Sequence, residues 1–393
     1  MPASGLPRTA DIVIVGAGVM GASIAFHLAQ RKAGRVVVLD RSLAGQGASG
    51  RSSALIRMHY TFPAEVALAV KSFEIFRRWK EIVGEPGDFR KTGFVRIVPA
   101  QEVDRLKANV AMQRKLGVNA TVIGPKELKA IEPDWIVDDI VAAAYEPDSG
   151  YGDGAGVAND FLTRAREMGV AYVSRTEAKS FLVQNGKVSG VATDKGNLEA
   201  PLVVAATGVW SVPLFKSVGF DVPLQIEYHE VAILNNAKGM KPGGCACIDS
   251  ITGTYFRSEG HDKTLIGSFT GPRGFNPDDF PQRASQDSLG ELIEAACKRL
   301  PALERAEVVR GITGLYDMTP DSRPMLGEIP GVADLHIVAG FSGMGFKISP
   351  AIGLVISELL LDGKAHSVDI SSFHPGRFAE GKPIHAECEY ADD

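Results

Sequence analysis

The sequence has few cysteines, no long apolar stretch and no excess of basic residues. Four of its 393 residues are cysteines, too few and too scattered for a disulfide framework or a cysteine-ligated metal site. No apolar stretch reaches the ~20 residues that cross a bilayer, and the opening segment MPASGLPRTA lacks the apolar core of a signal peptide. The net charge of −5 gives no sign of a basic, nucleic-acid-binding surface. We therefore expect a cytoplasmic protein with no membrane span, no metal and no nucleic-acid partner.

The chain is otherwise rich in apolar residues and in glycine. Hydrophobic residues make up 45% of it and charged residues 23%, as in soluble globular proteins. A length of 393 residues exceeds what one compact core usually holds, which predicts two domains or one large composite domain. The 43 glycines gather in a few segments, and those segments carry the functional signal.

The most specific segment is DIVIVGAGVMGASIAFHLAQRKAGRVVVLD, residues 11–40. A short β-branched run precedes Gly16, Gly18 and Gly21, which have the spacing G-x-G-x-x-G. A helical pattern and a second apolar run follow, and that run ends at Asp40, 19 positions after the last glycine. Strand, glycines, helix, strand and acid in this order predict a Rossmann-like dinucleotide site.

Each part of this pattern has a physical role. Gly16 permits the tight turn, Gly18 lets the backbone approach a pyrophosphate, and Gly21 allows the helix and the strand to pack closely. The helix N-terminus presents unpaired N–H groups and a positive dipole end to the phosphates. Asp40 is expected to accept from a ribose hydroxyl, which disfavours NADP. The fingerprint alone does not separate NAD from FAD.

Two further segments suit an extended cofactor. The stretch LAGQGASGRSSALIRMHY, residues 43–60, is rich in small residues, and Ser49, Ser52 and Ser53 offer hydroxyls. A buried strand predicted within PLVVAATGVWS, residues 201–211, ends in Ala-Thr-Gly. Ligands of open α/β sheets bind at such carboxyl ends of strands.

A third segment, GFSGMGFKISPAIGLVISELLLDG, spans residues 340–363. It places three glycines and Lys347 just before a predicted helix. Ser349 and Pro350 are expected to cap and begin that helix, so that its positive N-terminal end faces a cofactor-binding loop.

The motifs taken together resemble one family. The fingerprint, SGRSSALIRMHY, VVAATGVWS, and GLYDMTPDSRPMLGEI followed by LHIVAGFSGMGFKISPAIG resemble the FAD-dependent oxidoreductases typified by D-amino acid oxidase, glycine oxidase and sarcosine oxidase, nearest the sarcosine oxidase branch. The resemblance covers nearly the whole chain. It implies an α/β fold in which a Rossmann-like FAD-binding domain of the GR2 type carries a second, α+β substrate domain built on an antiparallel sheet. We place the FAD-binding domain at 1–85, 142–220 and 310–365, the substrate domain at 86–141 and 221–309, and a C-terminal tail at 366–393.

The resemblance also implies the site residues. In the sarcosine oxidase branch, the arginine and the lysine that match Arg57 and Lys347 bind the substrate carboxylate. An arginine offers a planar fork to a carboxylate and a lysine offers a point charge. Further candidates for the substrate pocket are His59, Tyr60, His229 and Tyr255. The residues expected to bind FAD are Gly16, Gly18, Val19, Met20, Gly21, Asp40, Arg41, Ala48, Ser49, Arg51, Ser52, Ser53, Ala178, Thr207, Gly208, Trp210, Gly314, Gly343, Met344, Gly345, Phe346 and Lys347.

Two positions depart from that branch. Gly314 stands where monomeric sarcosine oxidase has the cysteine that bonds covalently to flavin, so non-covalent binding of FAD is expected. Leu265 aligns with a lysine that promotes reaction with oxygen, which makes a dehydrogenase with another electron acceptor a credible alternative to an oxidase.

The expected activity is oxidation of the C–N bond of a small amino acid, a secondary or tertiary one such as sarcosine, by hydride transfer to flavin N5 and hydrolysis of the imine. A 2-hydroxy-acid dehydrogenase is one alternative, because carboxylate anchoring does not distinguish N from O at the reacting carbon. A flavin-binding subunit of a heteromeric dehydrogenase complex is another. The expected partners are a small amino acid or amine and an electron-accepting or heteromeric protein.

Overall fold

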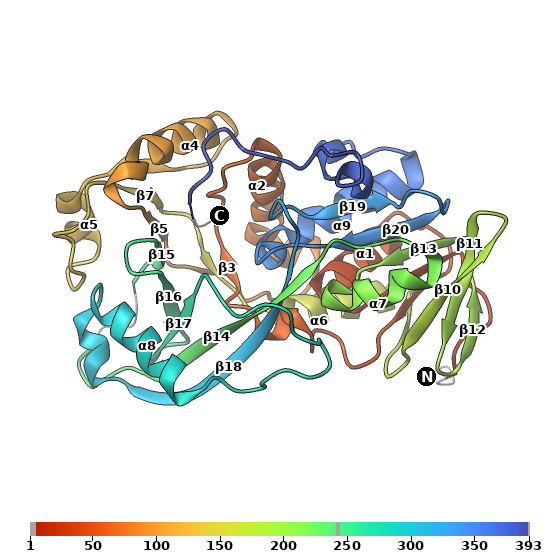
Figure 1. Ribbon diagram of the computed structural model, residues 1–393, viewed down its shortest axis with the longest axis horizontal. Coiled ribbons are helices and arrows are strands. Elements are labelled where there is room, and N and C mark those ends of the chain that lie inside the picture. The colour runs from red at the N-terminus through yellow and green to blue at the C-terminus, as the bar shows by residue number, and fades with distance from the viewer. Residues whose placement is uncertain (1–4, 241–243, 392–393) are drawn as a thin grey trace.

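The computed structural model describes residues 5–240 and 244–391, so residues 1–4 of the opening segment and 392–393 of the tail lie outside it. The chain forms two lobes joined by a pair of long strands, β14 (Gln225–Asn235) and β18 (Glu307–Met318) (Figure 1). One lobe gathers around α1 (Val19–Gln30) and α9 (Gly345–Asp362), and the other lies beside α8 (Gln286–Cys297). Within the described ranges, no helix is long and apolar enough to span a membrane.

The first lobe is built on a six-stranded sheet in the order β19-β20-β13-β1-β2-β9. Neighbouring strands pair in parallel, except that β19 is antiparallel to β20. Every residue of β1 and β2 is buried, as expected for a parallel sheet covered on both faces. The strands are β1 (Ile12–Val15), β2 (Val36–Leu39), β9 (Ala171–Val173), β13 (Leu202–Ala205), β19 (Met325–Glu328) and β20 (Leu335–Ala339).

Alternate residues of β1 point to the two faces of this sheet. Ile12 and Ile14 pack into the core with α1 and α9, while Val13 and Val15 pack on the other side with β10, β11 and α7. The helices of the first face are α1, α2 (Pro63–Arg77), α3 (Trp79–Ile82), α6 (Gly154–Glu167) and α9. The second face carries α7 (Ser211–Phe215) and a three-stranded sheet of β10 (Ala178–Gln184), β11 (Lys187–Thr193) and β12 (Gly196–Glu199).

The second lobe is built on an eight-stranded sheet in the order β18-β14-β17-β16-β15-β5-β7-β6. Its neighbouring strands are antiparallel except for β15 and β5, which pair in parallel. Its other strands are β5 (Phe94–Ile97), β6 (Thr121–Ile123), β7 (Ala143–Glu146), β15 (Ala246–Asp249), β16 (Thr254–Glu259) and β17 (Lys263–Ser268), and its helices are α4 (Val103–Lys115), α5 (Pro125–Ile131) and α8. Between the lobes lies a small sheet of β3 (Leu55–Ile56), β8 (Gly150–Tyr151) and β4 (Arg90–Lys91).

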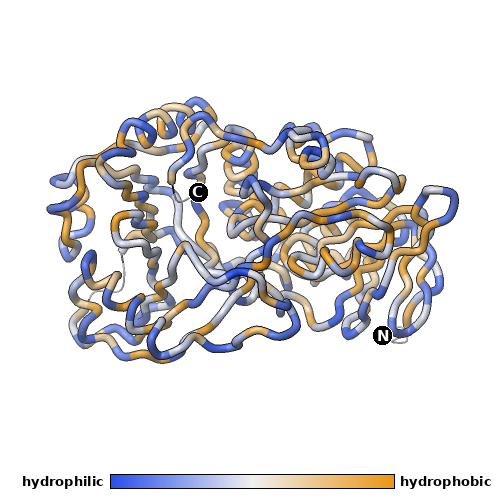
Figure 2. The backbone as a smooth tube through the Cα atoms, in the orientation of Figure 1, coloured by the Kyte–Doolittle hydropathy of each residue, from blue (hydrophilic) through white to orange (hydrophobic). Residues whose placement is uncertain are grey.

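The fold class predicted from the sequence is confirmed, because a Rossmann-like parallel sheet and a mainly antiparallel sheet are both present. Hydrophobic residues concentrate where the central helices and strands of each lobe pack, and the outer loops are mostly hydrophilic (Figure 2). The domain boundaries stay a prediction. β7 and most of β18, from residue 310 onward, belong to the eight-stranded sheet but lie outside the ranges predicted for the substrate domain.

The predicted start of the last helix is wrong. α9 begins at Gly345, and Pro350 lies inside it. A proline has no N–H, so the carbonyl of Phe346 loses its usual helical donor, but the hydroxyl of Ser349 donates to that carbonyl at 2.8 Å. The Ser-Pro pair is therefore accommodated within the helix, and the N-terminus of α9 lies next to the glycines that precede it.

Candidate active site

The turn between β1 and α1 brings three segments of backbone close together. Gly16 has φ +105°, and a Cβ at this position would collide with the carbonyl of Ala206, just after β13. A Cβ on Gly21 would collide with the carbonyl of Gly16. The N–H of Val19, the first residue of α1, donates to the hydroxyl of Ser49 at 3.0 Å. The glycines thus allow the N-terminus of α1 to lie at the carboxyl ends of the strands.

Asp40 follows β2 at the same edge of the sheet. Its Oδ2 accepts from the backbone N–H of Ala17 and its Oδ1 from that of Ser42, each at 2.7 Å. Burial raises the pKa of the Asp40 carboxyl, and these two hydrogen bonds oppose that rise. The carboxylate is therefore held in one orientation beside the turn that contains Gly16.

A cavity of 540 Å³ lies against these elements. We call it the large cavity. Its walls come from the β1–α1 turn, the segment after β2, the loop before β3, the end of β13, β18 and the start of α9. The residues predicted to bind FAD that line it are Gly16, Gly18, Val19, Met20, Asp40, Arg41, Ala48, Ser49, Arg51, Ser52, Ala178, Thr207, Gly208, Trp210, Gly314, Gly343, Gly345 and Phe346.

Four other residues predicted to bind FAD lie elsewhere. Gly21 packs inside the β1–α1 turn, against Gly16. Ser53, Met344 and Lys347 line a smaller neighbouring cavity. Of these, Lys347 was predicted both for FAD and for the substrate, and its position favours the substrate.

The large cavity also has walls that the sequence analysis missed. Thr176 and Glu177 follow β9, so the rule that ligands bind at the carboxyl ends of parallel strands could have found them. Tyr316 and Asp317 lie in β18, within the motif GLYDMTPD. The N–H of Gly340 donates to Asp317 at 2.7 Å, and burial raises the pKa of that carboxyl to about 6.

A loop of the second lobe closes one side of the large cavity. Asp278, in that loop, accepts from a guanidinium nitrogen of Arg41 at 2.8 Å and from the indole nitrogen of Trp210 at 2.9 Å. The Arg41 guanidinium lies 5.2 Å from the centroid of the Trp210 ring. No pattern in the sequence around Asp278 indicated this contact.

A second cavity, of 170 Å³, adjoins the first. We call it the small cavity. Tyr316 and Gly343 line both cavities, so the two spaces meet at these residues. Of the six residues predicted for the substrate pocket, five line the small cavity: Arg57, His59, Tyr60, Tyr255 and Lys347.

Arg57 and Lys347 lie near the ring of Tyr60. The guanidinium of Arg57 is 4.5 Å from the ring centroid and donates to the carbonyl of His59. The Nζ of Lys347 is 6.0 Å from the centroid and donates to the carbonyl of Gly343 at 3.3 Å. Burial, and next the charge of Arg57, lower the pKa of Lys347 well below its ordinary value, while Glu65 has the opposite effect. The half-buried guanidinium of Arg57 and the buried amine of Lys347 together favour an anionic ligand, whose charge would stabilise the protonated form of Lys347.

Other charged residues of the small cavity add to its excess of basic side chains. Arg96 and Arg323 add two guanidinium groups, and the sequence analysis predicted neither. Glu65 is the carboxylate among the described lining residues, and it lies 3.0 Å from the Nε of Arg323.

Burial, Arg96 and Arg57 lower the pKa of His59 well below its ordinary value, so its imidazole is neutral at pH 7.

His229 is not among the described residues that line the small cavity, because it lies behind Tyr316. Its Nδ1 is 3.1 Å from the carbonyl of Ser268, which can only accept, and its Nε2 is 3.1 Å from a carboxylate oxygen of Glu227. Burial alone would raise the pKa of Glu227, but hydrogen bonds from His229 and Arg273 outweigh it and lower the pKa.

The two positions that depart from the sarcosine oxidase branch also lie near these cavities. Gly314 lines the large cavity, where a Cβ would meet the backbone of Arg51 at 3.3 Å. Leu265 is buried and packs with Tyr255, which lines the small cavity.

The large cavity fits FAD on structural grounds. Two helix N-termini, those of α1 and α9, border it, and glycines leave space at both. Asp40 supplies an acceptor at one end, and Gly314 and Tyr316 of β18 lie where the large cavity meets the small one. A dinucleotide with its phosphates at the N-terminus of α1 would present its other end toward the small cavity.

Comparison with known proteins agrees with this assignment. The family model described as FAD dependent oxidoreductase, DAO, matches residues 11–359. Human mitochondrial sarcosine dehydrogenase is 25% identical, over 95% of this chain and 42% of its own length. Sarcosine oxidase subunit beta of Arthrobacter sp. is 26% identical, over 96% of this chain and 93% of its own. The chain spans less than half the length of the sarcosine and dimethylglycine dehydrogenases that it matches.

Solved structures agree in fold. L-proline dehydrogenase from P. horikoshii has a TM-score of 0.89 at 30% identity, with 96% of this chain and 100% of that chain covered. Glycine oxidase from Geobacillus kaustophilus has a TM-score of 0.83 at 25% identity, with 94% and 99% covered. The family model covers most of the chain, and the large cavity of the chain fits FAD. The chain therefore belongs to the DAO family of FAD-dependent oxidoreductases.

Proposed function

We propose that this chain oxidises the C–N bond of a small secondary or tertiary amino acid. The observation that carries the proposal is that Arg57 and Lys347, which are far apart in the sequence, line one small cavity that meets the cavity suited to FAD. These two cations suit a carboxylate. A volume of 170 Å³ suits a small substrate.

The chain's own residues orient the substrate. A carboxylate bound by Arg57 and Lys347 would stabilise the protonated form of Lys347, which burial disfavours. The two contacts would also hold the substrate in one orientation toward the large cavity. The substrate nitrogen and its neighbouring carbon would then extend toward Tyr316 and Gly343, where the cavities meet. FAD, when bound in the large cavity, supplies the chemistry by accepting a hydride from that carbon. Loss of the hydride leaves an iminium ion, which in the case of a secondary amine becomes an imine by releasing its N–H proton, and water hydrolyses it to an amine and a carbonyl compound.

The charges of the small cavity favour a neutral amine over an ammonium. Glu65, the carboxylate in its described lining, lies 3.0 Å from Arg323, and the remaining charged lining residues are cations. The names of several relatives point to N-alkylated amino acids: sarcosine dehydrogenase, dimethylglycine dehydrogenase and L-proline dehydrogenase. These names support, for this chain, a substrate such as sarcosine, dimethylglycine or proline.

Two further features bear on electron transfer. Leu265 packs beside Tyr255 and stands where the sarcosine oxidase branch has a lysine that promotes reaction with oxygen. The absence of a cation at this position supports a dehydrogenase that passes electrons to an acceptor other than oxygen. One relative is named as a subunit, sarcosine oxidase subunit beta, which supports a heteromeric complex as a second candidate. Gly314, which offers no thiol to flavin, supports non-covalent binding of FAD.

The direct test is bleaching of the bound flavin under anaerobic conditions by a panel of amino acids and 2-hydroxy acids. Reduction by an N-alkylated amino acid is the expected result. Size-exclusion chromatography of the isolated chain combined with turnover assays would show whether it needs a partner subunit.

A further inference from the structure

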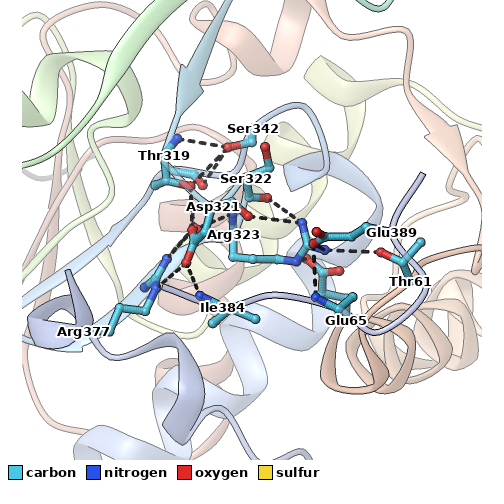
Figure 3. Close-up of polar contacts among 12 residues, drawn as sticks. Thr61, Glu65, Thr319, Asp321, Ser322, Arg323, Ser342, Arg377, Ile384 and Glu389 are labelled. Atoms are coloured by element: carbon cyan, nitrogen blue, oxygen red, sulfur yellow. Dashed lines mark hydrogen bonds and ion pairs between the residues drawn. The ribbon is translucent and has the colours of Figure 1, made fainter. Parts of the chain in front are cut away.

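The segment after α9 packs firmly on the rest of the protein. Both carboxylate oxygens of Asp321, in the turn after β18, accept from the Arg377 guanidinium at 2.9 Å. Oδ2 of Asp321 also accepts from the N–H of Ile384 at 2.9 Å (Figure 3). Arg377 is 1% exposed and Asp321 6%. These contacts hold the returning chain against the first lobe.

A second ionic contact brings the segment to the small cavity. Arg323 lines that cavity, and its Nη2 lies 2.9 Å from a carboxylate oxygen of Glu389 and 3.2 Å from the hydroxyl of Thr61. Its Nε lies 3.0 Å from Glu65 of α2 (Figure 3). Glu389 is thus bound to a residue of the cavity wall.

Tyr390 follows and forms part of that wall. It lines the small cavity and is 5% exposed. Its hydroxyl lies 2.9 Å from the Nε2 of His59, and the two rings are stacked with centroids 5.9 Å apart. The guanidinium of Arg96 lies 4.8 Å from the Tyr390 ring centroid. The ring therefore contacts both His59, just after β3, and Arg96 of β5.

The neighbours of Tyr390 are fixed as well. The side-chain amide of Asn109, in α4, donates to the carbonyl of Cys388 at 2.9 Å. The N–H of Ala391 donates to a carboxylate oxygen of Glu102 at 2.8 Å. The end of the described chain accordingly lies near α4 and α2 (Figure 1).

We propose that Tyr390 is a specificity-determining residue that limits the size of the substrate. The inference rests on the proposed function, because it assumes that Arg57 and Lys347 bind the carboxylate of the substrate. With the carboxylate held there, the rest of the substrate must fit within the remaining walls of the small cavity, which include Tyr316 and the fixed ring of Tyr390. Shortening Tyr390 would extend the small cavity and admit larger substrates.

The test uses carboxylates as probes and the absorbance change of bound FAD as the readout, so that it does not depend on turnover. Acetate, benzoate and 2-naphthoate are titrated into the FAD-loaded protein. In Tyr390→Ala, the Kd for 2-naphthoate relative to that for acetate is expected to fall at least about tenfold, since apolar pockets discriminate by roughly this factor per added group. Tyr390→Phe keeps the ring and should keep the wild-type ratio.

Two controls separate the possible outcomes. Glu387→Ala changes an exposed residue of the same segment and should leave all Kd values unchanged. Tyr390→Leu serves as a second shortened variant if Tyr390→Ala does not retain FAD. If a FAD-loaded shortened variant keeps the wild-type ratio of the Kd for 2-naphthoate to that for acetate, the inference about Tyr390 is wrong, and the proposed function is not affected. A wild-type protein that binds none of the carboxylates would overturn the proposed function, and the inference with it.

Discussion

The imidazole of His229 stacks on the ring of Tyr316, with ring centroids 3.9 Å apart and planes inclined by 22°. Tyr316 lines both cavities, so this stack supports the place where they meet. Behind it, His229 is 3.1 Å from Glu227, and both side chains are almost fully buried. The ring of Tyr316 therefore packs on a buried histidine–carboxylate contact that lines neither cavity.

Replacing His229 should destabilise the protein. His229→Leu would remove the buried partner of the Glu227 carboxylate, at a cost of about 1–3 kcal/mol in the free energy of unfolding. Arg273→Gln removes a second side-chain partner of the same carboxylate, at 2.7 Å, but that arginine side chain is 63% exposed, and the expected cost is about 0–1 kcal/mol. Urea unfolding of both variants measures the difference. Equal losses would contradict the proposed importance of the buried pair.

The raised pKa of Asp317 predicts a pH dependence of stability. Burial raises this pKa from 3.8 to about 6, so between these values the folded state binds more protons than the unfolded state. Stability from this group is thus lost as the pH rises from 4 to 6. Asp317→Asn removes the effect and should gain about 1–3 kcal/mol relative to wild type between pH 4 and pH 7. Chemical denaturation at a series of pH values would measure it, and a gap that shrinks with rising pH would refute it.

Lys347 should matter for substrate binding and much less for FAD. Lys347→Met removes a charged partner of the carboxylate, and the Kd for acetate should rise about 10- to 100-fold. FAD content should be close to that of wild type, because Lys347 lines the small cavity and not the large one. The matched control is Lys364→Met, at an exposed lysine just after α9. An equal effect of both substitutions would remove Lys347 from the site.

Local patterns were enough to predict the first strand–helix–strand unit of the fold. The spacing of Gly16, Gly18 and Gly21 and the acid Asp40 depends on one strand–helix–strand unit, and the structure has that unit. Asn185-Gly186 is likewise a dipeptide typical of hairpin turns, and β10 and β11 pair on either side of it.

Other features depend on contacts between distant segments. Arg96 in β5 and Tyr390 near the end of the described chain both reach the small cavity, and neither belongs to a recognisable motif. The start of α9 was misplaced for a different reason. A Ser-Pro pair is a strong local signal for a helix start, but here the hydroxyl of Ser349 compensates for the N–H that Pro350 lacks.

The central claim is that the small cavity presents the C–N bond of a carboxylate-bearing amine to FAD. Anaerobic titration of the FAD-loaded protein with sarcosine, dimethylglycine, proline, D-amino acids and 2-hydroxy acids tests it most directly, with the flavin absorbance as the readout. The account predicts bleaching by at least one of the three N-alkylated amino acids, and slower bleaching by the same compound in Lys347→Met. Bleaching by 2-hydroxy acids alone, or equal rates in wild type and Lys347→Met, would contradict it.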